Sequence, residues 1–148
     1  MNSEVNERLI QLQSLVGQEF SDSISPFMIW LKPTIVSATY GSLEFSYIIR
    51  REMTNPMGTL HGGVTAGIID DLIGATLYSM NLGAFYTTIN NAIDYFATAK
   101  EGDTIVAKTS IIKRGNTIIN AQCELFLPSK NRLIAKGYSN MLKVSKAQ

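Results

Sequence analysis

The fold is decided by residues 55–82, which read NPMGTLHGGVTAGIIDDLIGATLYSMNL. Plotted at about 100° per residue, residues 61–82 present an apolar side chain in almost every direction. The apolar set is Val64, Ile68, Ile69, Leu72, Ile73, Ala75, Leu77 and Met80. A helix that is apolar nearly all round is normally enclosed by the rest of the protein. We therefore predict a long central helix over about residues 61–82, entered through a loop at 52–58 and ended near Gly83.

Two adjacent carboxylates, Asp70 and Asp71, interrupt this apolar helix. Asp70 lies on the same helical stripe as Gly67 and Gly74, and each glycine costs a helix about 1 kcal/mol relative to alanine. A carboxylate with a glycine one turn before it and another one turn after it can be approached closely. This pattern favours a functional role for Asp70. Asp71 points about 100° away, where it is either solvated or hydrogen-bonded.

The start of the predicted helix carries two glycines, Gly62 and Gly63. The first N–H groups of a helix have no internal partner and lie at the positive end of its dipole, so they suit an anion or a developing oxyanion. However, Gly62 and Asp70 are eight residues apart, which is about 12 Å along a helix. One helix cannot bring both against a single reacting carbonyl. We therefore predict a homodimer in which Gly62 of one chain faces Asp70 of the other.

The segments around this helix predict a sheet. Apolar residues at helical spacing indicate a short amphipathic helix over residues 3–16. Residues 34–51 predict a hairpin that turns at 41–42, and four more strands are expected at 85–96, 104–113, 117–127 and 132–144. The order of helix, hairpin, long helix and antiparallel strands indicates an α+β domain in which a curled sheet surrounds one helix.

Composition excludes several classes of function. The chain has 148 residues, a net charge of +1 and 17% charged residues, which is typical of one globular domain that buries some surface in an oligomer. The single cysteine, Cys123, alternates with Ala121 and Leu125, so we assign it to the inert core. A lone cysteine also favours a reducing compartment, and we expect a cytoplasmic protein. One histidine and one cysteine make a metal cluster implausible.

Nucleic-acid binding and membrane insertion are also disfavoured. No apolar run is long enough to span a membrane, and the N-terminus lacks a signal-peptide pattern. Basic and aromatic residues are not interleaved, and the chain has neither a phosphate-binding glycine motif nor a serine-hydrolase elbow. After Thr104 the chain has eight basic residues and a single acidic residue, Glu124. Solvated strand faces explain most of them, and the alternative is a patch for a phosphate-bearing small molecule. The eight are Lys108, Lys113, Arg114, Lys130, Arg132, Lys136, Lys143 and Lys146.

The motif NPMGTLHGGVTAGIID at 55–70 resembles the signature of hot-dog-fold acyl-CoA thioesterases of the phenylacetic-acid-degradation type. The resemblance continues through YTTINNAIDYF at 86–96 and KRGNTI at 113–118, so it spans roughly residues 45–140. It implies one hot-dog domain over residues 1–148, dimers that pair into a continuous sheet, and often a homotetramer of two dimers. The implied reaction hydrolyses an acyl-CoA thioester to free acid and coenzyme A, with no metal and no cofactor other than the substrate's own coenzyme A.

The resemblance also implies roles for individual residues. The nucleophile or general base falls on Asp70, and the oxyanion donor is the backbone N–H of Gly62. The side chain that polarises the carbonyl or orients water falls on Asn55, and a small hydroxyl residue near the nucleophile falls on Thr88. His61 is expected to shape the turn before the helix. The coenzyme A contacts fall on Tyr95 and on the turn formed by Lys113, Arg114, Gly115, Asn116 and Thr117.

Three alternatives share this fold. A non-catalytic acyl-CoA-binding protein would keep the pocket and the basic patch, but it has no need of Asp70 beside two glycines. A dehydratase or hydratase usually requires a catalytic histidine paired with a carboxylate at another spacing, and His61 is the only histidine. In a structural scaffold, Asp70 would serve only as a hydrogen-bonding group.

The segment at 21–31 is the least regular part of the pattern. Pro26 and Pro33 bracket it and are expected to limit regular structure. Its apolar cluster is expected to be plain core, and the alternative is the wall of a pocket for an apolar acyl group. That cluster consists of Phe27, Met28, Ile29 and Trp30.

Overall fold

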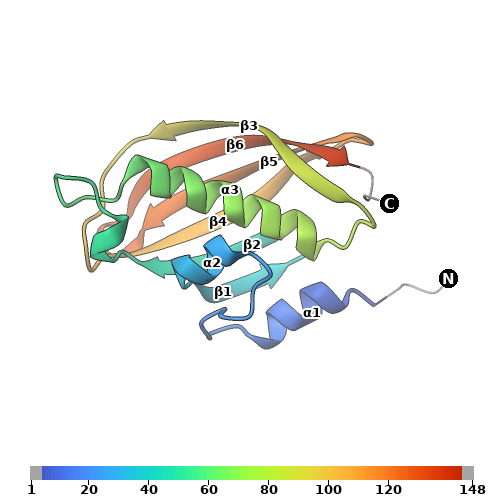
Figure 1. Ribbon diagram of the computed structural model, residues 1–148, viewed down its shortest axis with the longest axis horizontal. Helices are drawn as coiled ribbons and strands as arrows, with labels where there is room; N and C mark the ends of the chain where they lie inside the picture. Colours follow the sequence, from blue (N-terminus) through green and yellow to red (C-terminus); the bar gives the residue numbers. More distant parts are fainter. Residues whose placement is uncertain (1–4, 145–148) are drawn as a thin grey trace.

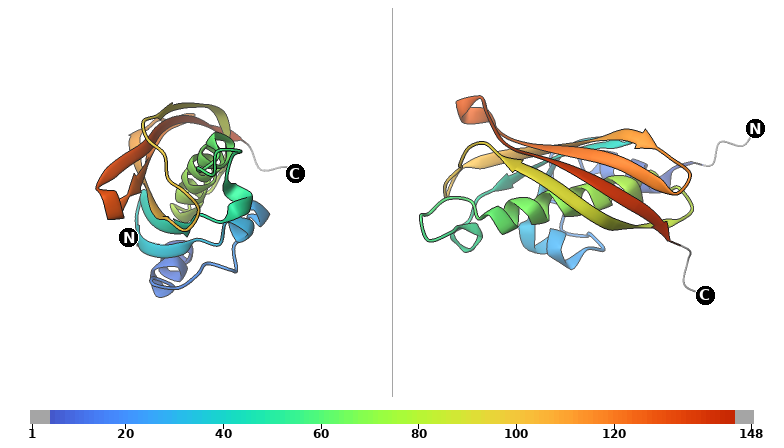
Figure 2. Two further views of the ribbon diagram at one scale, coloured as in Figure 1. Left: turned by 90° about the vertical axis from the view of Figure 1, so that its left-hand side faces the viewer. Right: turned by 90° about the horizontal axis from the view of Figure 1, so that it is seen from above.

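A long helix, α3 (Gly62–Ser79), crosses one face of a six-stranded sheet in the computed structural model, which describes residues 5–144 (Figure 1). Figure 2 shows, in its end-on view, that the sheet bends around this helix. The predicted α+β fold is therefore confirmed. The strands are β1 (Thr34–Thr39), β2 (Ser42–Ile48), β3 (Phe85–Tyr95), β4 (Thr104–Arg114), β5 (Ile118–Leu127) and β6 (Arg132–Val144).

All neighbouring strands are antiparallel, in the order β1-β2-β4-β5-β6-β3. In the described part of the chain β3 is thus an edge strand, paired with β6 on one side only. The pairing shifts register between Thr88 and Asn90, and this bulge turns both Thr88 and Asn91 toward α3. An edge strand of 11 residues leaves a long row of unpaired backbone groups, which is a ready surface for another strand.

The helix α3 is buried on one side and half-buried on the other. Ile68, Ile69, Leu72 and Ile73 are fully buried against the sheet. Residues 70, 71, 74 and 75 are half-buried, and Tyr78 is 38% exposed. The chain therefore does not enclose its helix on all sides. The half-buried side carries the two carboxylates and Gly74.

Two short helices precede the sheet. The first, α1 (Glu7–Ser14), is shorter than the predicted 3–16, and Asn6 caps it by accepting a hydrogen bond from the Leu9 N–H. Residues 3 and 4 of that prediction lie outside the described residues. Residues 51–53 and 128–130 form single 3-10 turns, η1 (Arg51–Met53) and η2 (Pro128–Lys130).

The expectation of limited regular structure at 21–31 was wrong, because Pro26–Leu31 form the helix α2. Pro26 stands at the first helical position, where its missing N–H is not needed, and Ser25 caps the helix. The expectation of plain core holds for Met28 but not for its three apolar neighbours, which are about 40% exposed. A helix of six residues that packs on the surface of the domain buries only one side.

The alternation predicted for β5 is confirmed. Ala121, Cys123 and Leu125 are buried, whereas the residues between them face outward. Burial raises the pKa of the Cys123 thiol well above its ordinary value, which keeps the thiol protonated and unreactive. The assignment of Cys123 to the inert core therefore holds. In residues 5–144, no helix combines the length and the apolar character needed to cross a membrane.

The two glycines that flank Asp70 predict different effects on stability. A Cβ at Gly74 would meet nothing within 4 Å, so we expect Gly74→Ala to raise the free energy of unfolding by about 1 kcal/mol. A Cβ at Gly67 would lie 2.6 Å from Cζ of Phe27, whose ring stacks on Trp30, so Gly67→Ala should give no such gain. Urea unfolding of the two variants measures the difference. Equal gains would contradict the close packing of Phe27 on Gly67.

Candidate functional site

Asp70 is held in place by the edge strand β3. The Thr88 hydroxyl donates to its Oδ1 at 2.8 Å, and the Asn91 amide donates to the same oxygen at 3.0 Å. Asn91 is itself fixed by a hydrogen bond that its Oδ1 accepts from the Ser139 hydroxyl. Among residues 5–144, no donor binds the second carboxylate oxygen, Oδ2. Asp70 is therefore oriented through one oxygen, and its other oxygen makes no hydrogen bond within the described residues.

The start of α3 presents an open backbone donor. His61 is the N-cap, and its Nδ1 accepts a hydrogen bond of 2.8 Å from the Gly63 N–H. The expected role of His61 in shaping the turn agrees with this geometry. The N–H of Gly62 has no acceptor in the described part of the chain. Tyr95 closes over this point, because its hydroxyl donates to the Gly62 carbonyl at 2.9 Å.

Asn55 organises the loop that leads into α3. Its Oδ1 accepts from the N–H groups of Met57 and Thr59, and its Nδ2 donates to the Thr59 hydroxyl at 2.8 Å. The acceptor of this amide is thus occupied. Its Nδ2 keeps a second hydrogen, so Asn55 is equipped to donate to a carbonyl or a water rather than to accept from one.

The sequence-predicted catalytic residues fall into two groups within one chain. Asp70 and Thr88 are in direct contact. Gly62 is two turns earlier on α3, about 12 Å along the helix axis, and contacts Tyr95 instead. Both groups lie against β3, with Thr88 and Tyr95 seven residues apart on that strand. The structure therefore does not bring Gly62 and Asp70 of one chain together.

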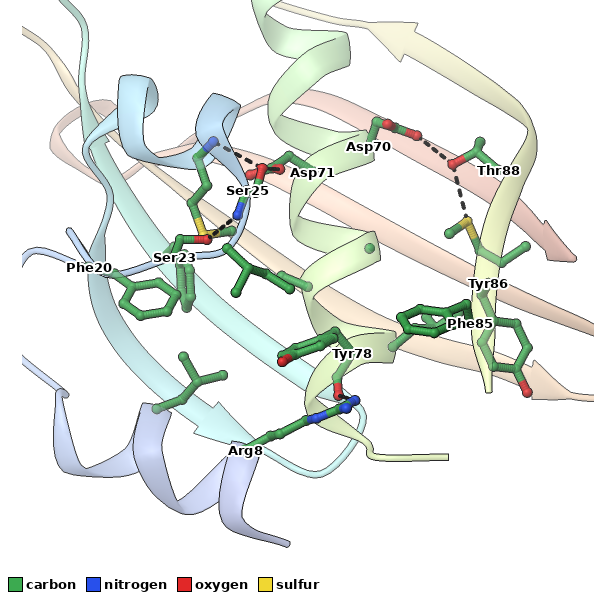
Figure 3. Close-up of a pocket in the computed structure, with 18 of the residues that line it drawn as sticks. Arg8, Phe20, Ser23, Ser25, Asp70, Asp71, Tyr78, Phe85, Tyr86 and Thr88 are labelled. Carbon is green, nitrogen blue, oxygen red and sulfur yellow. Dashed lines mark hydrogen bonds between the residues drawn. The ribbon is translucent and has the colours of Figure 1, made fainter. Parts of the chain in front are cut away.

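A cavity of about 620 Å³ begins at Asp70 and runs along the half-buried side of α3. Figure 3 shows Asp70 and Thr88 at one end of it and Tyr78 and Arg8 at the other. Apolar groups from the sheet and the helices line much of its interior, namely Leu12, Phe20, Met28, Phe45, Leu77 and Met141. Its size is typical of a small-molecule site. Of the apolar cluster at 27–30, only Met28 contributes to this wall.

Asp71 lies beside the cavity and anchors the start of α2. Its Oδ1 accepts a hydrogen bond of 2.8 Å from Ser25, the residue that caps α2 by accepting from the Met28 N–H. Its Oδ2 is buried and has no hydrogen-bond partner among the described residues. Burial raises the pKa of Asp71 from 3.8 to about 6, against the opposing effect of the Ser25 hydrogen bond. Of the two alternatives for Asp71, hydrogen bonding is the one observed.

The raised pKa of Asp71 predicts a pH-dependent stability. The folded chain holds this proton more tightly than the unfolded chain, so the free energy of unfolding should fall as pH rises from about 3.8 to about 6. The loss amounts to at most about 3 kcal/mol. Asp71→Asn accepts the same Ser25 hydrogen bond without a charge, so it should lack this loss. Urea unfolding of both proteins across this range gives the difference, and identical pH profiles would contradict the prediction.

The turn between β4 and β5 borders a second, shallower hollow. Lys113, Gly115 and Thr117 line it, together with Ile89, Ile118, Asn120 and Asn140. Gly115 is required here, because a Cβ on it would lie 2.6 Å from the Ile118 carbonyl oxygen. Arg114 points elsewhere and donates to the Tyr40 hydroxyl at 3.1 Å. Asn116 is in the turn but does not line the hollow.

The expected coenzyme A contacts are also separated within one chain. The Thr117 carbonyl accepts from the N–H of Lys143, which pairs with Tyr86 on β3. Tyr95 is nine residues further along that strand, about 30 Å away. Of the eight basic residues after Thr104, Lys113, Arg114 and Lys143 lie at this turn. Lys136 instead forms an ion pair with Glu124 at 3.3 Å, and Lys146 lies outside the described residues.

Sequence reasoning missed two parts of this site. Nothing in the dipeptide Asn90-Asn91 indicates that Asn91 binds Asp70, because strict alternation from Thr88 would turn it outward and only the bulge brings it back. The hydrogen bond between Ser25 and Asp71 was not predicted either, because the two residues are 46 positions apart in sequence.

No group of three histidine, cysteine, aspartate or glutamate side chains suited to a metal occurs in residues 5–144.

Comparison with known proteins identifies the family and the fold of this chain. The family model of the thioesterase superfamily matches residues 57–133. Human acyl-coenzyme A thioesterase 13 is 34% identical over 106 residues, which are 72% of this chain and 76% of that protein. The structure of the Escherichia coli PaaI protein from the phenylacetic acid degradation operon has a TM-score of 0.80 at 15% identity, covering 96% of this chain and 97% of its own. A hypothetical thioesterase from Streptococcus pneumoniae, solved with coenzyme A, has a TM-score of 0.72 at 19% identity, covering 78% and 88%.

Proposed function

Because this chain belongs to the thioesterase superfamily and is a thioester hydrolase of the hot-dog fold, we propose that it cleaves acyl-CoA at a site built by two copies of the chain. The human relative is named as an acyl-coenzyme A thioesterase, and the Streptococcus pneumoniae neighbour was solved with coenzyme A. Acyl-CoA is accordingly the substrate class. The reaction yields a free acid and coenzyme A, and the chemistry described below needs neither a metal nor a separate cofactor.

One observation supports a site shared by two chains. The unpaired edge strand β3 contacts Asp70 through Thr88 near its start and Gly62 through Tyr95 at its end. If two β3 strands pair antiparallel about a two-fold axis near residues 91 and 92, Tyr95 of one chain lies opposite Thr88 of the other. The partner's Gly62 then approaches Asp70. The same pairing joins two sheets into one and removes the exposed edge.

The reacting groups have complementary roles in this arrangement. The partner's Gly62 N–H donates to the thioester oxygen and stabilises the negative charge that develops there. The free Oδ2 of Asp70 either takes a proton from a water that attacks the carbonyl, or attacks the carbonyl itself to form an anhydride that water then hydrolyses. In both routes the C–S bond breaks and coenzyme A leaves as the thiolate, which takes up a proton. Thr88 and Asn91 keep that oxygen oriented through Oδ1. Asn55 supplies a second N–H donor to the carbonyl or the water.

Coenzyme A is bound across the same interface in this proposal. The strand pairing brings Tyr95 of one chain to within three strand spacings, about 15 Å, of the other chain's 113–117 turn. That turn offers the Lys113 cation for a phosphate group, and Arg114 would join it by leaving the Tyr40 hydroxyl. The thiol end of coenzyme A extends toward Asp70. The two separated groups of coenzyme contacts in one chain thereby become one binding surface.

Two homodimers then form the homotetramer that we propose. The outer face of the sheet exposes apolar side chains that a second dimer would cover, including Ile112, Ile118 and Tyr138. We also propose a cytoplasmic location, which fits the buried free thiol of Cys123.

The proposed function is tested by measuring thiol release from a panel of acyl-CoA thioesters together with sedimentation of the protein. Turnover by a dimer or tetramer supports the proposal. A protein that binds acyl-CoA without turnover would instead be the non-catalytic binder. Full activity in a monomer would contradict the dimeric site.

A further inference from the structure

We propose that Gly74 sets the length of acyl chain that the site accepts, and that the chain runs along α3 from Asp70 to a wall formed by α1. This inference rests on the proposed acyl-CoA hydrolysis and adds a specificity-determining residue to it. The acyl group that fits is a straight chain of medium length rather than a single aromatic ring.

Gly74 has no packing reason to be glycine. It is one turn beyond Asp70 on α3 and lines the cavity, and a Cβ there would meet nothing within 4 Å. Glycine inside a helix is destabilising by about 1 kcal/mol. Gly67, one turn before Asp70, differs because Phe27 occupies the space beside it. The gap left by Gly74 is therefore the passage from the reacting carbonyl into the rest of the cavity.

The far end of the cavity is lined by α1. The Arg8 guanidinium donates to the Tyr78 carbonyl at 3.2 Å and lies 4.0 Å from the centre of the Tyr78 ring. Asn6 donates to the Ser79 carbonyl at 2.8 Å. These bonds tie α1 to the last turn of α3, where the Tyr78 carbonyl also accepts from the Asn81 N–H. They hold α1 in place. Arg8 and Tyr78 thus form a fixed wall (Figure 3).

The distance between the two ends gives the chain length. Asp70 and Tyr78 are eight residues apart on α3, about 12 Å. An extended alkyl chain advances about 1.3 Å per carbon, given C–C bonds near 1.5 Å. About nine carbons therefore reach from the carbonyl to the wall. Phe20, Phe45 and Met141 provide the apolar contacts along this path, whereas a phenyl ring would fill only the part next to Asp70.

The test measures kcat/KM of wild type, Gly74→Leu and Gly74→Ala for butanoyl-, octanoyl-, decanoyl-, tetradecanoyl- and phenylacetyl-CoA. Wild type should prefer octanoyl- or decanoyl-CoA. Because a leucine side chain would occupy the passage, Gly74→Leu should lower the ratio of decanoyl to butanoyl kcat/KM by at least about tenfold. Gly74→Ala adds one methyl group and should shift the ratio less, in the same direction. If Gly74→Leu does not fold, the ratio measured for Gly74→Ala still tests the inference.

A second variant addresses the wall. Arg8→Ala should raise the ratio of tetradecanoyl to decanoyl kcat/KM, because it opens the far end. Hydrolysis that prefers phenylacetyl-CoA, or chain-length ratios unchanged in the Gly74 and Arg8 variants, would overturn this inference and leave the proposed function intact. No hydrolysis of any acyl-CoA by wild type would overturn the proposed function itself.

Discussion

Asp70→Asn should lower kcat for acyl-CoA hydrolysis by about 10² to 10⁴, because an amide can neither take a proton from water nor attack the thioester. The change is nearly isosteric. Thr88 and Asn91 donate to Oδ1, and an asparagine oxygen accepts the same two bonds. The side chain should therefore keep its place while losing its chemistry. Thiol release under saturating acyl-CoA measures the effect.

The control for this prediction removes a carboxylate elsewhere. Glu101→Gln changes one exposed charge in the turn before β4 and should leave the rate unchanged. Sedimentation should find Asp70→Asn in the same oligomer as wild type. A variant at position 70 that hydrolyses acyl-CoA at the wild-type rate would leave Asp70 with only a structural role.

Gly62→Pro should also lower kcat strongly, because it removes the proposed oxyanion donor while leaving the helix intact. Gly62 is the first residue of α3, a position that favours proline. The preceding residue, His61, has φ −64° and ψ 133°, which is the conformation favoured before proline. With the N–H gone, kcat should fall by about 10² to 10³. Thermal unfolding should show that the fold is retained.

Gly62→Ala is the matched control, because it keeps the N–H. Its added Cβ would lie 3.6 Å from the Tyr95 ring, an ordinary contact. The alanine variant should be at least about tenfold more active than the proline variant. Equal activities in a folded pair would mean that the Gly62 N–H does not bind the reacting oxygen.

The periodicity of apolar residues predicted the main elements, because the side that a helix or a strand turns toward the core determines where its apolar residues stand. Apolar residues on α3 and alternation along β5 follow directly from which side faces the sheet. The pattern does not predict the helix α2, because a proline inside a segment argues against regular structure, whereas Pro26 stands at the first helical position, where proline favours a helix. The open side of α3 was also missed. Composition marks residues as apolar, but it does not reveal which of them this chain leaves for a ligand or a second copy.

The candidate site was predictable where it depends on spacing along one helix. The separation of Gly62 and Asp70 follows from the helical rise alone. The partners of these residues depend on tertiary contacts instead. Asn91 reaches Asp70 through a bulge in β3, and Ser25 reaches Asp71 across 46 residues. Neither contact has a signal in a single sequence.

The most direct test of the shared site mixes two inactive variants. Asp70→Asn and Gly62→Pro chains are refolded together in equal amounts, and thiol release is compared with that of each variant refolded alone. If each site takes Asp70 from one chain and Gly62 from its partner, random pairing rebuilds about a quarter of the sites in wild-type form. We predict recovery of about a quarter of the wild-type activity. A mixture no more active than its separate components, with mixed oligomers present, would contradict the two-chain site.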